Sequence, residues 1–258
     1  MLDARNSQLF QTLSIALLIV LALLVAYESW LSRPWTWIVV LACLLAFFIV
    51  LGLWIMRLPL GILINERNLM SLSRLQIVTW SALIFSAYIV FVMQRIGRVP
   101  NPLAVTVDNQ LWAILGISTA SFVGTPLILN TKVDQSPTPE AVNKASNALK
   151  ESTVDIQQNA KGTLYSNPDP KDARFSDIFQ GDEVGNTASV DVSKVQMFLI
   201  TVILFGIYAS DIWTALAKPV TDLGALPSPD ENMLKLFALS HAGYLSFKAV
   251  GHTDSTSK

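Results

Sequence analysis

Six stretches of this chain contain no Asp, Glu, Lys or Arg, and they alternate with polar connections. They cover 6–27, 34–56, 75–94, 109–131, 195–210 and 236–247. A helix needs roughly 20 apolar residues to cross the hydrocarbon core of a bilayer. The first four stretches reach that length, and the last two are shorter. The pattern predicts an all-α, polytopic integral membrane protein with about six transmembrane helices.

The polar residues that flank these stretches set the expected helix bounds. The expected helices cover about 9–26, 35–55, 75–93, 109–129 and 231–250, and the fifth in chain order begins at 194 and ends within 211–219. The first stretch is too long for a signal-peptide apolar region, so we expect a retained helix. Trp30, Trp35 and Trp37 mark one membrane interface, where amphipathic rings lie at headgroup depth.

A long polar segment, 130–191, separates the fourth stretch from the fifth. It holds six basic and ten acidic side chains, so it must lie in water. Alanines and a leucine at helical spacing predict a short helix within 139–161. Phe175, Ile178 and Phe179 form an apolar patch that we expect to dock on the membrane or on the helix ends.

The apolar part contains an internal repeat. Ser73-Arg74-Leu75-Gln76 returns 120 residues later as Ser193-Lys194-Val195-Gln196. A second match, offset by 122, pairs Asp108, Ser118 and Ala120 with Asp230, Ser240 and Ala242. Repeats in multi-pass proteins generate paired helical units. We therefore expect four parts: an N-terminal transmembrane hairpin (1–60), a first two-helix unit (61–129), the polar extramembrane segment (130–191), and a second unit with a short tail (192–258).

Polar residues shared by the two copies fit helix caps. Ser73 with Gln76, and Ser193 with Gln196, have the Ser-x-x-Gln spacing of a capping box, in which Ser and Gln satisfy backbone N–H groups reciprocally. Asp108 and Asp230 fit N-caps of the following helices, where an acidic side chain suits the helix dipole. The alternative for the Ser-x-x-Gln motif is a ligand-binding role.

The second helix of each copy has small residues at every fourth position. Such residues let helix backbones approach closely in lipid, so they predict helix packing. They are Gly116, Ala120, Gly124, Ala238, Ala242 and Ser246. The alternative is that a narrow polar path runs beside Ser118 and its neighbours.

The copies differ in ionisable residues. Asp211, His241 and Lys248 stand where the first copy has Phe, Thr and Pro. An ionisable group at membrane depth is costly unless it faces protein or water, so such residues mark candidate functional sites. The candidate pore or partner site consists of Asp211, His241, Tyr244, Lys248, Ser118 and Ser240. The alternative is that the short sixth stretch is only partly inserted, with ordinary interface charges and a packed histidine.

Composition narrows the functional classes. The chain is 52% apolar and 14% charged, and its net charge of −1 argues against nucleic-acid binding, which requires basic surface. The single cysteine, Cys43, can form no intramolecular disulfide. We find no catalytic constellation, metal-ligand spacing or phosphate-binding glycine loop. The sequence therefore predicts a protein that is not an enzyme and has no cofactor.

Basic residues near the helix ends favour one orientation. The side of the N-terminus has eight: Arg5, Arg57, Arg67, Arg74, Lys132, Lys194, Lys248 and Lys258. The opposite side has five: Arg33, Arg95, Arg98, Lys218 and Lys235. Lys and Arg accumulate in cytoplasmic loops. We expect cytoplasmic N- and C-termini, in a bacterial inner membrane, and a cytoplasmic 130–191 segment.

Four short motifs resemble those of a group of uncharacterised bacterial multi-pass membrane proteins. They are Ser71-Leu72-Ser73-Arg74-Leu75-Gln76, Arg174-Phe175-Ser176-Asp177-Ile178-Phe179, the 185–198 run from Gly185-Asn186 to Val195-Gln196-Met197-Phe198, and Leu239-Ser240-His241-Ala242-Gly243-Tyr244-Leu245. The resemblance spans about 60–250. It implies a bacterial membrane protein of this plan, and it carries no activity, cofactor or site.

Two functions fit these observations. The first is a non-enzymatic membrane scaffold or assembly subunit, which forms homo-oligomers or a larger membrane complex through its small-residue faces and binds a cytoplasmic protein through 130–191. The alternative is a pore or transporter subunit with a path beside the fourth and sixth helices. The lipid bilayer is a partner in both.

Overall fold

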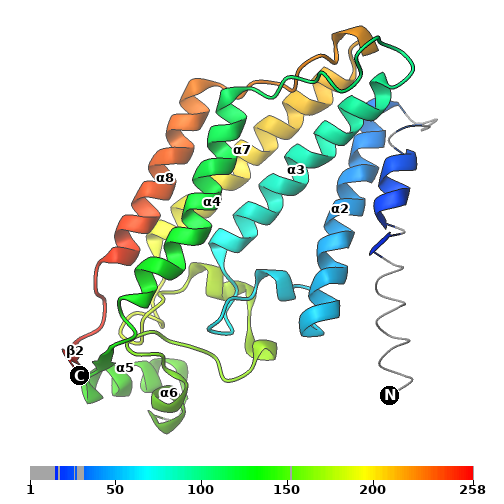
Figure 1. Cartoon of the computed structure of the whole chain (residues 1–258). Coiled ribbons are helices and arrows are strands. Elements are labelled where there is room, and N and C mark those ends of the chain that lie inside the picture. The colour runs from blue at the N-terminus through cyan, green and yellow to red at the C-terminus, as the bar shows by residue number, and fades with distance from the viewer. Residues whose placement is uncertain (1–14, 17, 26, 28–31, 152, 258) are drawn as a thin grey trace, which may run out of the picture. The chain divides into compact units, whose positions relative to one another are not determined.

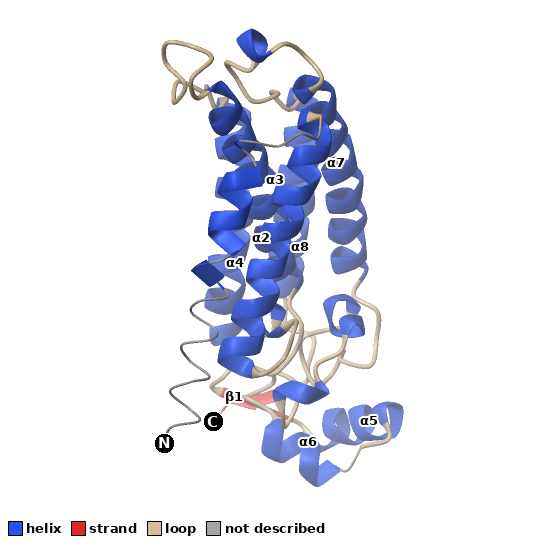
Figure 2. Cartoon of the chain, turned by 90° about the vertical axis from the view of Figure 1, so that its right-hand side faces the viewer, coloured by secondary structure: helices blue, strands red, loops and turns tan. Residues whose placement is uncertain are grey.

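A computed structural model describes residues 15–16, 18–25, 27, 32–151 and 153–257, and most of these are helical (Figure 2). Four helices within this part are long and apolar enough to cross a membrane. They are α2 (Arg33–Met56), α3 (Leu72–Arg95), α4 (Asn109–Asn130) and α7 (Val192–Leu216) (Figure 1). The structure is thus all-helical, as expected, with helices long and apolar enough to cross a membrane.

The other two expected transmembrane helices, the first and the sixth, are not among these four. Of the helix expected at 9–26, positions 15–16 and 18–25 are described and helical, and the rest lies outside the described residues. Helix α8 (Glu231–Ala249) has nearly the expected bounds. It is not among the four apolar candidates because charged residues such as Lys235 and Lys248 interrupt its apolar positions.

The caps of α3 and α7 lie two residues earlier than the sequence motif indicates. Helix α7 is capped by Asp191, whose carboxylate accepts from the Lys194 backbone N–H at 3.1 Å and from the Ser193 hydroxyl at 2.5 Å. Helix α3 likewise begins at Leu72, after Ser71. Both expected capping boxes are therefore wrong, because Ser73 and Ser193 lie inside the helices. At α7 the Asp191 carboxylate takes the capping role.

The two glutamines of the expected boxes also have other surroundings. Gln76 is buried and donates to the Thr201 hydroxyl at 2.6 Å, whereas Gln196 is exposed. At the other two helix starts, Asp108 accepts from the Gln110 backbone N–H at 2.9 Å and Asp230 accepts from that of Asn232 at 2.8 Å. Both aspartates thus have the geometry expected of N-caps.

The polar segment folds around a small apolar core, to which Leu69, before α3, also contributes. Its helices α5 (Pro139–Leu149) and α6 (Thr153–Asn159) lie side by side (Figure 1). Strand β1 (Gln135–Pro137) pairs antiparallel with β2 (Ser255–Ser257), near the end of the chain. Short 3-10 helices are η1 (Gly61–Leu63), η2 (Pro170–Asp172), η3 (Phe175–Phe179) and η4 (Val220–Asp222). The core consists of Leu69, Val142, Ala145, Ile156, Tyr165 and Val184.

The chain forms two compact units, each built from separate segments. One contains Val78–Leu115 and Ile203–Leu234 together with the chain up to Ile62. The other contains Leu63–Ile77, Gly116–Val202 and Lys235–Lys258. Helices α3, α4, α7 and α8 each contribute to both units, and the whole polar segment belongs to the second.

In the first unit, arginine side chains bind free carbonyls at helix ends. Arg33 donates to the Leu216 carbonyl at 3.0 Å, at the end of α7. Arg95 donates at 2.8 Å to the carbonyls of Leu223 and Asn101, in the two connecting loops. These contacts satisfy acceptors that a helix end or a loop would otherwise leave open.

Candidate functional site

The second unit contains a buried group of ion pairs centred on Asp182. Its carboxylate lies 2.5 Å from the Arg67 guanidinium and 3.2 Å from the Lys194 ammonium, and it also contacts the Lys248 ammonium. All four residues are at least nine-tenths buried. Three cations from three separate elements therefore converge on one carboxylate.

Each cation reaches this point from the end of a helix. Arg67 lies in the turn before α3, Lys194 in the first turn of α7 and Lys248 in the last turn of α8. Asp182 follows Gly181, where a Cβ would overlap the side-chain amide of Asn186. Glycine at this position lets the loop fold closely enough to direct Asp182 into the cluster.

The backbone around Asp182 is held by the same groups. The Tyr165 N–H donates to the Asp182 carbonyl at 3.0 Å. The Arg67 guanidinium donates to that carbonyl at 2.8 Å and to the carbonyl of Tyr165 at 3.0 Å. Arg67 thus binds the loop through main-chain and side-chain oxygens together, a geometry that its five fixed donors allow and a lysine would not reproduce.

A second buried pair lies next along the chain. The Lys132 ammonium contacts the Glu183 carboxylate at 2.5 Å and donates to the carbonyls of Lys248 and Val250 at 2.7 and 2.6 Å. The other carboxylate oxygen of Glu183 accepts from the His252 backbone N–H at 3.0 Å. All three ammonium protons of Lys132 have acceptors, and two of these are at the C-terminal end of α8. We call Arg67, Lys132, Asp182, Glu183, Lys194 and Lys248 the ion-pair cluster.

The electrostatic balance of the cluster keeps its central carboxyl ionised. Burial by itself would raise the pKa of Asp182, but the positive charges of Lys194, Lys248 and Arg67 outweigh burial and hold that pKa well below its ordinary value. A cavity beside Asp182, Glu183 and Lys132 measures only about 10 Å³. This volume holds no more than about one water molecule, so the cluster has no room for a substrate.

Apolar packing accompanies the charges. Ile178, in η3, is buried with Leu72, Met197 and Tyr244, and Phe179 packs against the same group. The rings of Phe179 and Phe198 meet edge to face at 5.1 Å. Of the two docking places that the sequence allowed for the Phe175, Ile178 and Phe179 patch, the structure has the helix ends.

The residues of the expected polar site are only partly brought together. His241 Nδ1 and the Ser121 hydroxyl share a hydrogen bond of 2.6 Å, and the Tyr244 hydroxyl and Thr125 one of 3.3 Å. The Lys248 ammonium lies 4.7 Å from the centroid of the Tyr244 ring. His241, Tyr244 and Lys248 therefore share the face of α8 that meets α4.

The other members of that expected site are placed less favourably for ligand contact. Ser118 is buried on α4, and the buried Ser240 hydroxyl donates to the Phe237 carbonyl within its own helix at 2.9 Å. Asp211 is exposed on the part of α7 that belongs to the first unit. Within the described residues, no group of three His, Cys, Asp or Glu side chains could hold a metal ion.

The sequence reasoning assigned no role in a site to five of the six cluster residues. Arg67 and Lys132 appeared there only as orientation charges, Lys194 as an orientation charge and a member of the repeat motif, and Asp182 and Glu183 only as part of a polar segment. A usable signal was present in Gly181-Asp182-Glu183-Val184-Gly185, where two carboxylates stand between glycines. Nothing local in that run says which cations it meets.

No family model, curated protein or solved structure matches this chain.

Proposed function

We propose that this protein is a non-enzymatic membrane assembly subunit, in which exposed small-residue faces of α4 and α8 contact neighbouring helices in the bilayer. Exposure of these faces carries the proposal. Gly116 and Ala120 on α4 are exposed, as are Ala242 and Ser246 on α8. A Cβ placed on Gly116 would have nothing within 4 Å beyond its chain neighbours and the backbone of its own helix.

The remaining two small residues have contacts inside the chain. A Cβ on Gly124 would lie 3.7 Å from the Leu245 side chain, and Ala238 is half-buried. Intrachain packing of α4 against α8 instead uses Ser121, Thr125 and their partners on α8. The exposed small residues are thus free for contact with another helix, where close backbone approach favours association in lipid.

The polar segment supplies the second half of this proposal, a partner surface in water. Six buried residues of the ion-pair cluster hold the segment against helix ends, so its outer surface is presented rigidly. On α5 that surface carries the exposed side chains of Glu140, Asn143, Lys144 and Asn147. A pre-ordered surface loses less conformational entropy when a partner binds.

The number of crossings and the duplication of the two-helix unit are part of the same proposal. Six crossings with a duplicated two-helix unit would make α3–α4 and α7–α8 equivalent pairs in the same orientation. Contacts between α4 and α8 support this, because Ser121 meets His241 and, further along both helices, Thr125 meets Tyr244. Residue numbers that rise together in this way describe parallel neighbours.

Association through the α4 face is testable by native mass measurement after gentle solubilisation. We expect an oligomer or larger complex for the natural chain, and dissociation for the double variant Gly116→Leu with Ala120→Leu. Val202→Phe is the control, since it enlarges an exposed side chain on α7 outside the small-residue faces. A natural chain that is strictly monomeric and co-purifies with nothing would refute the proposal.

One observation favours the alternative of a pore or transporter subunit. His241 Nε2 and the Ser118 hydroxyl are buried, and neither has a hydrogen-bond partner among the described residues. Unsatisfied buried polar atoms are rare, and a polar path for water or solute beside α4 and α8 would satisfy them. The narrow, fully paired ion-pair cluster weighs against an open path.

Reconstituted protein separates the two functions. A pore or transporter subunit should give a measurable flux, and His241→Ala should change it. Ser240→Ala is the matched control on α8, because its hydroxyl bonds only within the helix. Protein that carries no flux, or identical flux in both variants, would remove His241 from any transport role.

A further inference from the structure

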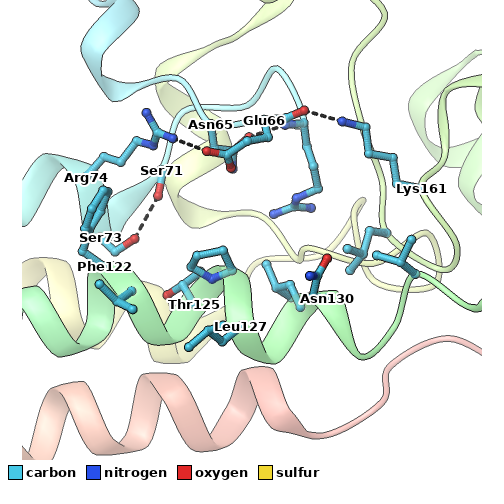
Figure 3. A pocket seen from close by; sticks show the side chains of 16 residues that line it. Asn65, Glu66, Ser71, Ser73, Arg74, Phe122, Thr125, Leu127, Asn130 and Lys161 are labelled. Atoms are coloured by element: carbon cyan, nitrogen blue, oxygen red, sulfur yellow. Dashed lines mark hydrogen bonds and ion pairs between the residues drawn. The ribbon is translucent and has the colours of Figure 1, made fainter.

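A cavity of about 530 Å³ lies in the second unit, apart from the ion-pair cluster's own small void. It is lined by the turn before α3, the first turn of α3, the last turns of α4, and the loop at Lys161 (Figure 3). Its volume falls in the range of ordinary small-molecule sites. One wall is charged and the other is apolar.

The charged wall carries more positive than negative groups. Arg74 contacts the carboxylate of Glu66, and the Lys161 ammonium donates to the Glu66 backbone carbonyl (Figure 3). Arg67 also lines the cavity, but Asp182 already binds it. The Glu66 side chain is 71% exposed and can turn away at little cost, which leaves Arg74 for an anion. Lys161 keeps its bond to the Glu66 backbone carbonyl and has two further ammonium protons to donate.

The apolar wall belongs to α4. Phe122, Val123 and Leu127 line it, and Arg74 lies 5.9 Å from the centroid of the Phe122 ring. Val123 is 48% exposed and Leu127 64% exposed. Because α4 is one of the four candidate membrane spans, this wall continues onto a surface that lipid would cover.

The cavity also lies at the right depth for a lipid headgroup. Helix α3 begins at Leu72 and α4 ends at Asn130, so both candidate spans end beside it. Basic side chains at that level meet lipid phosphates, and basic pockets between transmembrane helices bind anionic headgroups. A soluble anion would satisfy the charged wall but leave the apolar wall without a partner.

We propose that this cavity binds the anionic headgroup of a phospholipid, with the headgroup along the charged wall of Arg74 and Lys161 and the acyl chains along Val123 and Leu127. The inference is independent of the assembly function. It predicts that lipid charge, rather than lipid in general, determines occupancy.

The test uses the full chain, stripped of lipid in detergent and titrated with phosphatidylglycerol or phosphatidylcholine, with binding followed by native mass spectrometry. We expect phosphatidylglycerol to bind several-fold more tightly. Arg74→Gln and Lys161→Gln should each weaken it about fivefold, the effect of one cation near an anionic surface. Lys171→Gln, an exposed change of the same charge on η2, should leave it unchanged.

A variant that binds more tightly cannot owe its effect to misfolding. Glu66→Gln is such a variant, because removal of the competing carboxylate should tighten phosphatidylglycerol binding. Equal binding of the two lipids, or charge variants that match the natural chain, would overturn the proposal. Displacement of phosphatidylglycerol by millimolar inorganic phosphate would assign the site to a soluble phosphate compound instead.

Discussion

At the scale of single residues, Asp182 is the most consequential side chain in the described structure. It binds three cations that come from the start of α3, the start of α7 and the end of α8. A buried charge without its partner is costly, whereas a complete set of partners offsets the cost of burial. Loss of this one carboxylate would leave three buried cations facing each other.

Asp182→Asn should therefore destabilise the polar segment strongly, by about 3–5 kcal/mol, the usual cost of breaking a buried pair. Hydrogen exchange of the α5 and α6 amides in detergent would measure this. Asp155→Asn, an exposed carboxylate on α6, should change exchange little. Equal protection in the two variants would mean that the cluster does not hold the segment.

The pH dependence of this contribution has a definite sign. Because the folded-state pKa of Asp182 is depressed, its stabilisation is fully present above the ordinary carboxyl value of about 3.9 and is lost as pH falls through the folded pKa. We expect the stability difference between the natural chain and Asp182→Asn to be constant from pH 7 to pH 5 and to shrink below about pH 4. A difference already lost at pH 5 would contradict this.

At the scale of elements, the helix starts show how a local motif can mislead by two residues. Ser193 and Gln196 have the spacing of a capping box, but Asp191 accepts the bonds that a cap must accept. A carboxylate at a helix start is a stronger acceptor than a hydroxyl and also suits the helix dipole. The serine therefore donates to the cap instead of being one.

The two possible caps of α7 predict opposite orders of variant stability. Asp191→Ala should cost about 1 kcal/mol or more, the typical loss for an N-cap, and Ser193→Ala clearly less. Thermal unfolding in detergent would rank them. The reverse order of stability would instead support a capping box at Ser193.

Helix existence and approximate bounds were predictable at this scale, and their surroundings were not. The uncharged stretches predict α2, α3, α4 and α7 to within a few residues, because an apolar run of that length has few other stable states in lipid. The partners of Gln76 and Lys248 could not be predicted, since Thr201 and Asp182 are distant in sequence.

At the scale of the whole molecule, contacts link the polar segment to one end of the helices. Asn68, before α3, donates to the Asn167 carbonyl at 2.8 Å, and β1 pairs with β2 near the end of the chain. Lys132, Lys194 and Lys248 are bound by the carboxylates of that segment. The basic residues that favoured a cytoplasmic N-terminus are thus partly neutralised in the folded protein.

These links predict which positions share a side of the membrane. In a Cys43→Ala background, cysteines at Lys144 and Asp254 should react with an impermeant reagent from one side, and a cysteine at Arg98, beyond the end of α3, from the other. All three positions are exposed. Reaction at Lys144 and Arg98 from the same side would exclude a crossing by α3.

The sequence by itself determined the helical membrane class, the polar character of 130–191, and the caps at Asp108 and Asp230, because apolar length, charge density and N-cap chemistry act locally. Only the tertiary structure decided that Asp182 and Glu183 meet four cations, that the Ile178 patch docks on helix ends, and that half-exposed α4 residues line a cavity with Arg74. Those outcomes depend on which side chains, distant in sequence, come into contact. Charges attract each other more strongly in the buried, low-dielectric interior than they do in water.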